Sequence, residues 1–157
     1  MKIVDYQSKQ SINHLKLFLV ERDLEFQALY ERYRFESMAG VESIFALYST
    51  LQQLISSEIK GDVIDIGCWQ GGVSKMIAEL LNAAKSKKKL FSIDTFEGYP
   101  LPSSIDEDVW GNSMLKRFNK EAVKSGGMTL ASYANTSQSL QQIFKYAECI
   151  KAKVDES

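Results

Sequence analysis

A cluster of three glycines lies between two short apolar runs, each of which contains an aspartate. Gly67, Gly71 and Gly72 follow the run that contains Asp65, and Asp94 closes the next apolar run along the chain. Glycines let backbone N–H groups approach a ligand closely, and a carboxylate at a strand end can accept hydrogen bonds from ribose hydroxyls. This combination indicates a nucleotide-type site, and we expect a ligand that contains adenosine.

A strand, a helix and a second strand must position these groups. The β-branched run over 62–66 predicts a buried parallel strand that ends at the glycines. Apolar residues then recur at helical spacing from Val73 to Leu81, and 90–93 forms the second apolar run. The stretch 61–98 is therefore predicted to be the first β-α-β unit of a nucleotide-binding sheet.

Helices are predicted before this unit. Apolar residues at three- and four-residue steps indicate helical structure over about 11–33, with a break near 21–23. A second apolar stripe predicts a helix that Ser37 caps and that ends near 59–60. Since this helix leads directly into the first strand, we expect it to pack on one face of the sheet.

The second half of the chain offers fewer strand signals. A proline-containing loop runs from Gly98 to about Gly111, and helices are predicted over 112–123 and 140–150. Residues 128–133 are at best a weak third strand. Because a parallel unit with an unpaired apolar edge tends to aggregate, we expect the chain to be the front part of a larger α/β domain.

Composition excludes several classes of function. The 157 residues carry a formal net charge of −1 with 45% hydrophobic and 25% charged residues, which is typical of a globular protein and gives no electrostatic case for nucleic acid or an anionic membrane. Two cysteines and one histidine, His14, cannot form a disulfide framework or a Cys/His zinc site. The longest N-terminal apolar run, 17–20, is far too short for a membrane span, so we expect a cytoplasmic protein.

The glycine loop departs from the two best-known nucleotide loops. A phosphate loop requires a lysine after its last glycine, and here Val73 stands in that place, so ATP or GTP hydrolysis is disfavoured. The dinucleotide fingerprint requires a glycine where Trp69 stands, which makes NAD or FAD a minority interpretation. A loop with a bulky middle and a preceding acid suits a ligand without phosphates, such as S-adenosylmethionine.

Two segments carry a family resemblance. VIDIGCWQGG followed by SIDTFEGYP resembles the class I S-adenosylmethionine-dependent methyltransferases, and specifically the macrocin O-methyltransferase (TylF-type) family, with the clearest match over 37–102. The resemblance implies an α/β fold, namely an incomplete Rossmann-like class I methyltransferase sheet made of N-terminal helices and the first β-α-β unit. Residues 1–60 would form a helical and lid segment, and 61–157 the N-terminal half of the methyltransferase domain.

The resemblance also implies which residues bind S-adenosylmethionine. Asp65 would lie near the amino-acid end of the cofactor, and Ser74 would reach its carboxylate. Asp94 would hold the ribose hydroxyls, while Met38 would belong to a lid. The other implied cofactor contacts are Gly67, Cys68, Trp69, Gly71, Gly72, Thr95 and Phe96.

Four of these residues also have a structural interpretation. Asp65 could be a paired internal acid, Trp69 a packing residue over the loop, and Cys68 a buried filler, which its type favours over a nucleophile. Asp94 could be a solvated strand-end acid. The acidic run 106–108 is more typical of a solvated loop than of a cation site.

Catalytic residues are not predicted in this chain. In the family that it resembles, aspartates at the ends of later strands bind Mg²⁺ and the acceptor hydroxyl, so Mg²⁺ would be held outside this chain. The expected acceptor is a small molecule or a glycan, with a sugar or natural-product hydroxyl as methyl acceptor, and a homo-oligomer is compatible with the sequence. The alternatives are a non-catalytic remnant that binds a nucleotide or a protein, and an NAD-binding Rossmann protein.

Overall fold

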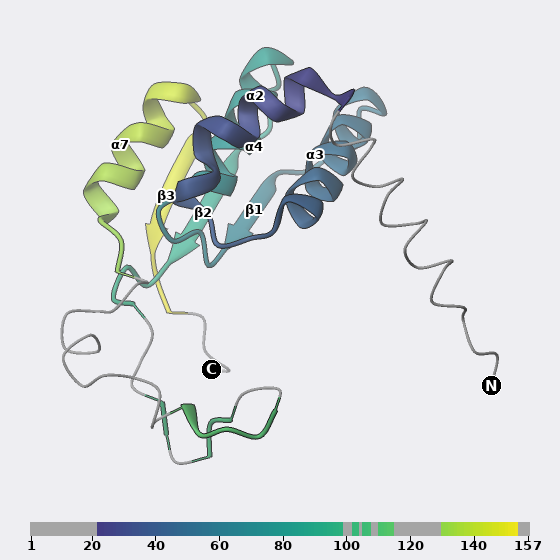
Figure 1. The fold of residues 1–157 in the computed structure, drawn as a ribbon. Helices are drawn as coiled ribbons and strands as arrows, with labels where there is room; N and C mark the ends of the chain where they lie inside the picture. The colour runs from purple at the N-terminus through teal and green to yellow at the C-terminus, as the bar shows by residue number, and fades with distance from the viewer. Residues whose placement is uncertain (1–21, 99–101, 104, 108–109, 115–129, 154–157) are drawn as a thin grey trace, which may run out of the picture.

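The chain folds as an α/β structure with a parallel sheet and a layer of helices (Figure 1). This computed structural model describes residues 22–98, 102–103, 105–107, 110–114 and 130–153. The strands are β1 (Val63–Ile66), β2 (Leu90–Asp94) and β3 (Ala147–Lys151), in the spatial order β1-β2-β3. The helices are α2 (Leu24–Tyr33), the 3-10 turn η1 (Arg34–Glu36), α3 (Val41–Ser56), α4 (Gly72–Ala83) and α7 (Tyr133–Ile143).

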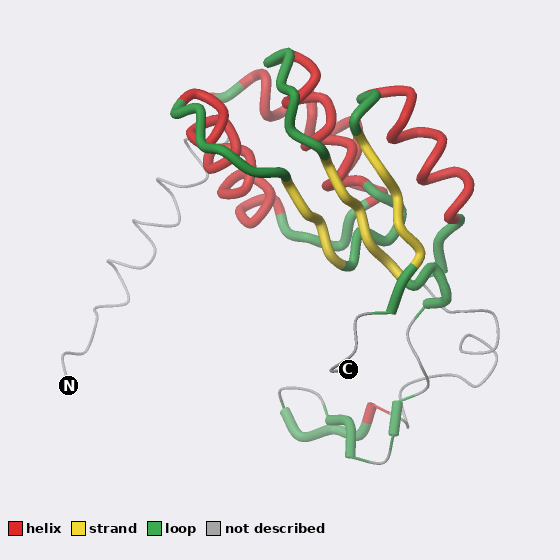
Figure 2. The backbone as a smooth tube through the Cα atoms, turned by 180° about the vertical axis from the view of Figure 1, so that it is seen from behind, coloured by secondary structure: helices red, strands yellow, loops and turns green. Residues whose placement is uncertain are grey.

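All of these helices lie on the same side of the sheet, where α4 and α7 make the main contacts with the strands and α2 and α3 pack mainly on α4. Figure 2, seen from behind, shows the three strands in front of the helices, with no described element over the near face. Two side chains of β1 on that face, Ile64 and Ile66, are 61% and 64% exposed. The prediction of a buried strand over 62–66 was therefore wrong in part, because only alternate side chains of β1 face the helices.

Helix α4 lies at the centre of the hydrophobic core. Its buried face includes Ala78 and Leu81, which are fully buried, and Leu90 of β2 is fully buried as well. Burying a leucine side chain contributes roughly 1.5–3 kcal/mol. The same core cluster includes Phe26 of α2 and Leu140 of α7, so the helices before and after the glycine loop share one core with the sheet.

The N-terminal helices begin at identifiable caps. Asp23 caps α2, because its Oδ1 accepts a hydrogen bond of 2.9 Å from the Phe26 N–H, which confirms a break within 21–23. The predicted cap of the next helix was wrong: α3 follows Gly40, whereas Ser37 ends η1 and its Oγ accepts from Ala39 N. Helix α3 also ends at Ser56, before the predicted end near 59–60.

The predicted C-terminal elements needed a larger correction. The apolar residues over 140–150 are divided between the end of α7 at Ile143 and strand β3, because pairing with β2 satisfies the backbone of 147–151. The strand predicted over 128–133 is not seen: residues 130–132 form no strand, and Tyr133 begins α7. Residues 128–129 lie outside the described ranges. Most of the predicted helix 112–123 also lies outside them. Among the described residues, every helix is too short or too polar to cross a lipid bilayer.

Candidate functional site

The glycine loop joins β1 to α4 at the carboxyl end of the sheet. Its backbone is tied to β2, since the N–H groups of Gly67 and Cys68 donate to Ile93 O at 2.8 and 3.3 Å. Gly71 closes the turn with a hydrogen bond of 2.8 Å to Cys68 O and adopts φ 81°, a left-handed conformation that favours glycine. Trp69 also has a positive φ, of 52°. The loop is therefore a tight turn in which side-chain-free positions bring the backbone close to the strand ends.

Asp94 faces this loop from the end of β2. Its Oδ2 accepts a hydrogen bond of 2.8 Å from Trp69 N, and its Oδ1 accepts one of 2.9 Å from Phe96 N. The Thr95 hydroxyl lies 3.5 Å from the same Oδ1. The structure thus brings together the two groups from which the adenosine site was predicted, although they are 25 residues apart.

Asp65 and Ser74 are paired with each other. Ser74 is fully buried on the first turn of α4, and its hydroxyl donates a hydrogen bond of 2.5 Å to Asp65 Oδ2. Burial raises the pKa of Asp65, the hydrogen bond from Ser74 opposes that shift, and the nearby charge of Asp94 adds to it. The paired internal acid is the arrangement observed for Asp65, and the predicted contact of Ser74 with a cofactor carboxylate stays a prediction.

Cys68 is a residue of the loop and lies beside the other cysteine of the chain, Cys149. Both thiols are buried and free of disulfide bonds. Hydrogen bonding with Cys149 and burial raise the pKa of the Cys68 thiol, and the carboxylates of Asp65 and Asp94 add to the shift. A thiol with a raised pKa is a poor nucleophile, so Cys68 has the properties of a buried filler.

The other predicted cofactor residues lie around the loop with different exposures. Phe96 is buried and packs edge-on against Tyr133, with ring centroids 5.3 Å apart. Trp69 is half-buried, and its indole Nε1 is a buried donor without a hydrogen-bond partner among the described residues. Met38, just after η1, is 60% exposed. These positions leave their predicted roles untested.

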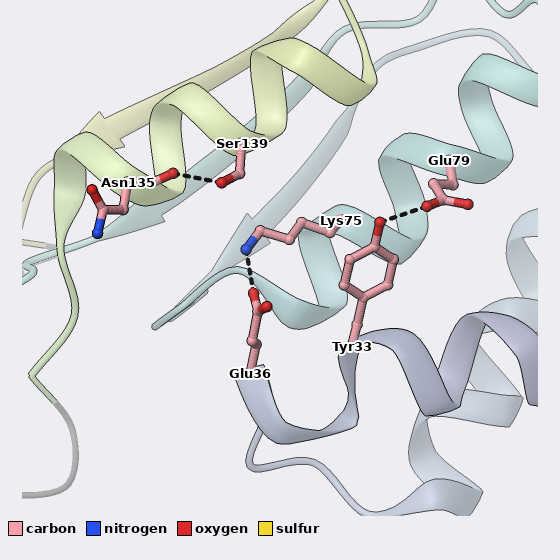
Figure 3. Close-up of polar contacts among 6 residues, drawn as sticks. All are labelled: Tyr33, Glu36, Lys75, Glu79, Asn135 and Ser139. Carbon is pink, nitrogen blue, oxygen red and sulfur yellow. Dashed lines mark hydrogen bonds and ion pairs between the residues drawn. The ribbon is translucent and has the colours of Figure 1, made fainter.

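The sequence analysis missed two residues next to the loop. Lys75 of α4 forms an ion pair with Glu36 of η1 (Figure 3). No local pattern marks this pair, because Lys75 lies opposite the apolar stripe formed by Val73, Met76 and Ile77 on the predicted helix. Only its burial in the structure points to a partner, since buried lysines are rare unless paired.

The acidic run 106–108 takes part in no cation-binding cluster among the residues that the structure describes. Asp106 Oδ2 accepts hydrogen bonds from Ser103 N and Oγ at 2.6 and 2.9 Å, and these bonds lower the pKa of Asp106. No group of three His, Cys, Asp or Glu side chains that could hold a metal occurs among the described residues. Asp108 lies outside them.

Comparison with known proteins identifies the family. The family model described as macrocin-O-methyltransferase (TylF) matches residues 8–126, which is more than half of the chain. The chain belongs to this family. The comparison with curated proteins found no match.

Two solved structures of methyltransferases resemble the TylF-family chain. The O-methyltransferase NovP matches with a TM-score of 0.55 and 15% identity over 73% of this chain and 46% of that chain. The calicheamicin methyltransferase CalS11 matches with a TM-score of 0.49 and 11% identity over 96% of this chain and 60% of that chain. The chain therefore spans about half of the length of these proteins. The match to NovP confirms the predicted fold, a partial Rossmann-like methyltransferase sheet.

Proposed function

We propose that this chain is the cofactor-binding half of an S-adenosylmethionine-dependent O-methyltransferase. The single observation that carries the proposal is the meeting of the Asp94 carboxylate with the backbone of the glycine loop at Trp69. Family membership supports methyl transfer to oxygen. The cofactor supplies the methyl group, and the glycine loop and Asp94 bind and orient the cofactor.

The donor and acceptor groups at the loop suit adenosine. A carboxylate offers about four acceptor positions, and the two oxygens of Asp94 each accept one strong backbone hydrogen bond. The Thr95 hydroxyl makes one further, long hydrogen bond of 3.5 Å to Oδ1, and the acceptor capacity that remains suits ribose hydroxyls, which donate. Phe96 and Thr95 follow Asp94 directly, so an adenine attached to that ribose would lie beside them. Methyl transfer needs alignment above all, and a ribose held against a rigid loop contributes to it.

The rest of the predicted machinery is proposed to lie beyond these residues. Removing the proton of an acceptor hydroxyl requires a base or a metal, and we assign no residue of this chain to that task. We propose residues 1–60 as the helical and lid segment and 61–157 as the N-terminal half of the catalytic domain. The exposed face of β1 supports the second part of this proposal, because a sheet with helices on one side is half of a doubly covered sheet.

A sugar or natural-product hydroxyl is the acceptor that we propose from the family, with Mg²⁺ bound by residues outside this chain. A cytoplasmic location and a homo-oligomer stay predictions.

Calorimetric titration tests the proposal. The chain should bind S-adenosylmethionine and S-adenosylhomocysteine with micromolar affinity, and it should not bind NAD. Ser103→Ala is a control for changes outside the site, since it removes a hydroxyl from the loop after β2 without touching Asp94, and it should bind as the wild-type chain does. A chain with a folded circular-dichroism spectrum that binds none of these ligands would instead be a non-catalytic remnant, and binding of NAD alone would indicate a dinucleotide protein.

A further inference from the structure

An ion pair joins the turn after α2 to the helix that follows the glycine loop. Lys75 Nζ donates to Glu36 Oε2, and the side chains are 10% and 36% exposed (Figure 3). Lys75 also lines a cavity of about 380 Å³ with Gln70 of the loop and with Asn135 and Ser139 of α7. Because the ammonium is largely removed from water, breaking this pair costs more than breaking a surface pair.

The backbone of the same turn lies directly against the start of α4. A Cβ placed on Gly72 would approach the backbone C and O atoms of Glu36 and the O atom of Tyr33 to 2.7 Å. The segment between η1 and α3, which begins with Ser37 and Met38 in the sequence, passes the end of the sheet from which the glycine loop emerges (Figure 1). The position of these two residues relative to the loop therefore depends on how η1 is held.

A second contact joins α2 to α4, one turn of α4 further from the loop. Tyr33 Oη and Arg32 both donate to Glu79 Oε1 at 2.5 Å. Burial and the Glu79 hydrogen bond raise the pKa of Tyr33 to about 12, so the phenol stays a donor at neutral pH. Figure 3 shows the two contacts side by side on α4, with Lys75 directed to Glu36 and Glu79 to Tyr33. Glu79 thus holds α2, whereas Lys75 holds the turn.

We propose that Glu36 and Lys75 are positioning residues of the cofactor site, which hold the Ser37–Met38 turn against the glycine loop. This inference rests on the proposed function. In this scheme the cofactor lies between the Ser37–Met38 segment and the glycine loop and leaves when that segment moves away, so loss of the ion pair accelerates dissociation of the cofactor. Neither side chain touches the reacting atoms in this scheme, and their effect passes through the backbone of the turn.

Three variants of the full chain separate this role from a general effect on stability. Lys75→Met keeps the apolar stem, and Glu36→Gln keeps the shape of the side chain, while each removes one charge of the pair. Glu79→Gln is the matched control, because it weakens the contact between α2 and α4 and leaves both partners of the Glu36–Lys75 pair in place. The double exchange Glu36→Lys with Lys75→Glu restores an ion pair with reversed polarity.

Stopped-flow measurement of S-adenosylhomocysteine dissociation gives the main result. Lys75→Met and Glu36→Gln should raise the dissociation rate about 5- to 30-fold. Glu79→Gln should leave it within about twofold, and the double exchange should recover most of the loss. Hydrogen exchange of the ligand-free chain should quicken at the amides of 37–39 in the first two variants and not in the control.

The outcomes distinguish the two proposals. Unchanged dissociation in Lys75→Met and Glu36→Gln, with a wild-type chain that binds, refutes the positioning role and leaves the proposed function standing. An equal acceleration in Glu79→Gln also refutes it, since the effect would then be one of general helix packing. A wild-type chain that does not bind S-adenosylhomocysteine refutes the proposed function and the positioning role together.

Discussion

Replacing Asp94 is the most informative single change, because this carboxylate has both a structural and a proposed binding role. In Asp94→Ala the N–H groups of Trp69 and Phe96 lose their acceptors, which lie at 2.8 and 2.9 Å. A hydrogen bond to a charged group contributes about 1.5–3 kcal/mol, and Asp94 is half-buried, so we expect a loss of about 3 kcal/mol of unfolding free energy for the two bonds. Loss of the ribose contacts should weaken S-adenosylhomocysteine binding by about 1–3 kcal/mol, or roughly 5- to 150-fold.

Urea unfolding and calorimetric titration measure the two effects separately. Asp94→Asn is the control for folding, because its single carbonyl oxygen retains one of the two backbone hydrogen bonds. Its loss of unfolding free energy should therefore be about half of that in Asp94→Ala. Its affinity should still fall, since the amide nitrogen cannot accept a hydrogen bond from a hydroxyl. A folded Asp94→Asn or Asp94→Ala protein with wild-type affinity would remove Asp94 from the site and with it the main support for the proposed function.

Two further changes test the packing of the loop. Gly72→Ala should lower the free energy of unfolding in urea by about 1–2 kcal/mol, because the clash of the new Cβ with the backbone of η1 outweighs the helix propensity of alanine. Gly40→Ala is the control: its Cβ would lie 3.5 Å from Glu42 Oε2, so the free energy of unfolding should change by about a few tenths of a kcal/mol. A stabilised Gly72→Ala protein would contradict the observed contact. Asp65→Asn tests the raised pKa of Asp65. Because the pKa of Asp65 is raised above its ordinary value of 3.8, the folded chain binds the proton of this carboxyl more tightly than the unfolded chain does. The stabilisation from this proton is complete below pH 3.8 and is lost as the pH rises through the pKa of the folded chain. Asp65→Asn should remove this decline when unfolding is followed from about pH 3 to pH 7, and identical pH profiles would show that the Asp65 carboxyl is not shifted.

Local patterns were sufficient for the elements nearest the glycine loop. The helix predicted after the glycines is α4, and the apolar run 90–93 is β2 with Asp94 added at its end. Helix α4 has periodic apolar residues and begins at the glycines, and β2 is a short apolar run between a lysine cluster and Asp94, so the signal lies within each segment. The prediction of one helix over 140–150 was wrong, because the apolar spacing of this segment fits a helix and a strand equally well. Pairing with β2 decided between the two.

The amino-acid sequence by itself determined the order of the first strand, loop, helix and second strand, and the family to which the chain belongs. These properties depend on residues close together in the chain. Only the tertiary structure decided that Asp65 is paired with Ser74, that Asp94 holds the loop backbone at Trp69, and that Lys75 meets Glu36. The partners in these contacts are between 9 and 39 residues apart, and their hydrogen bonds form only after the helices and strands have packed. Periodicity within a segment carries no information about such pairs, because it describes which face of an element is apolar and not which element covers that face.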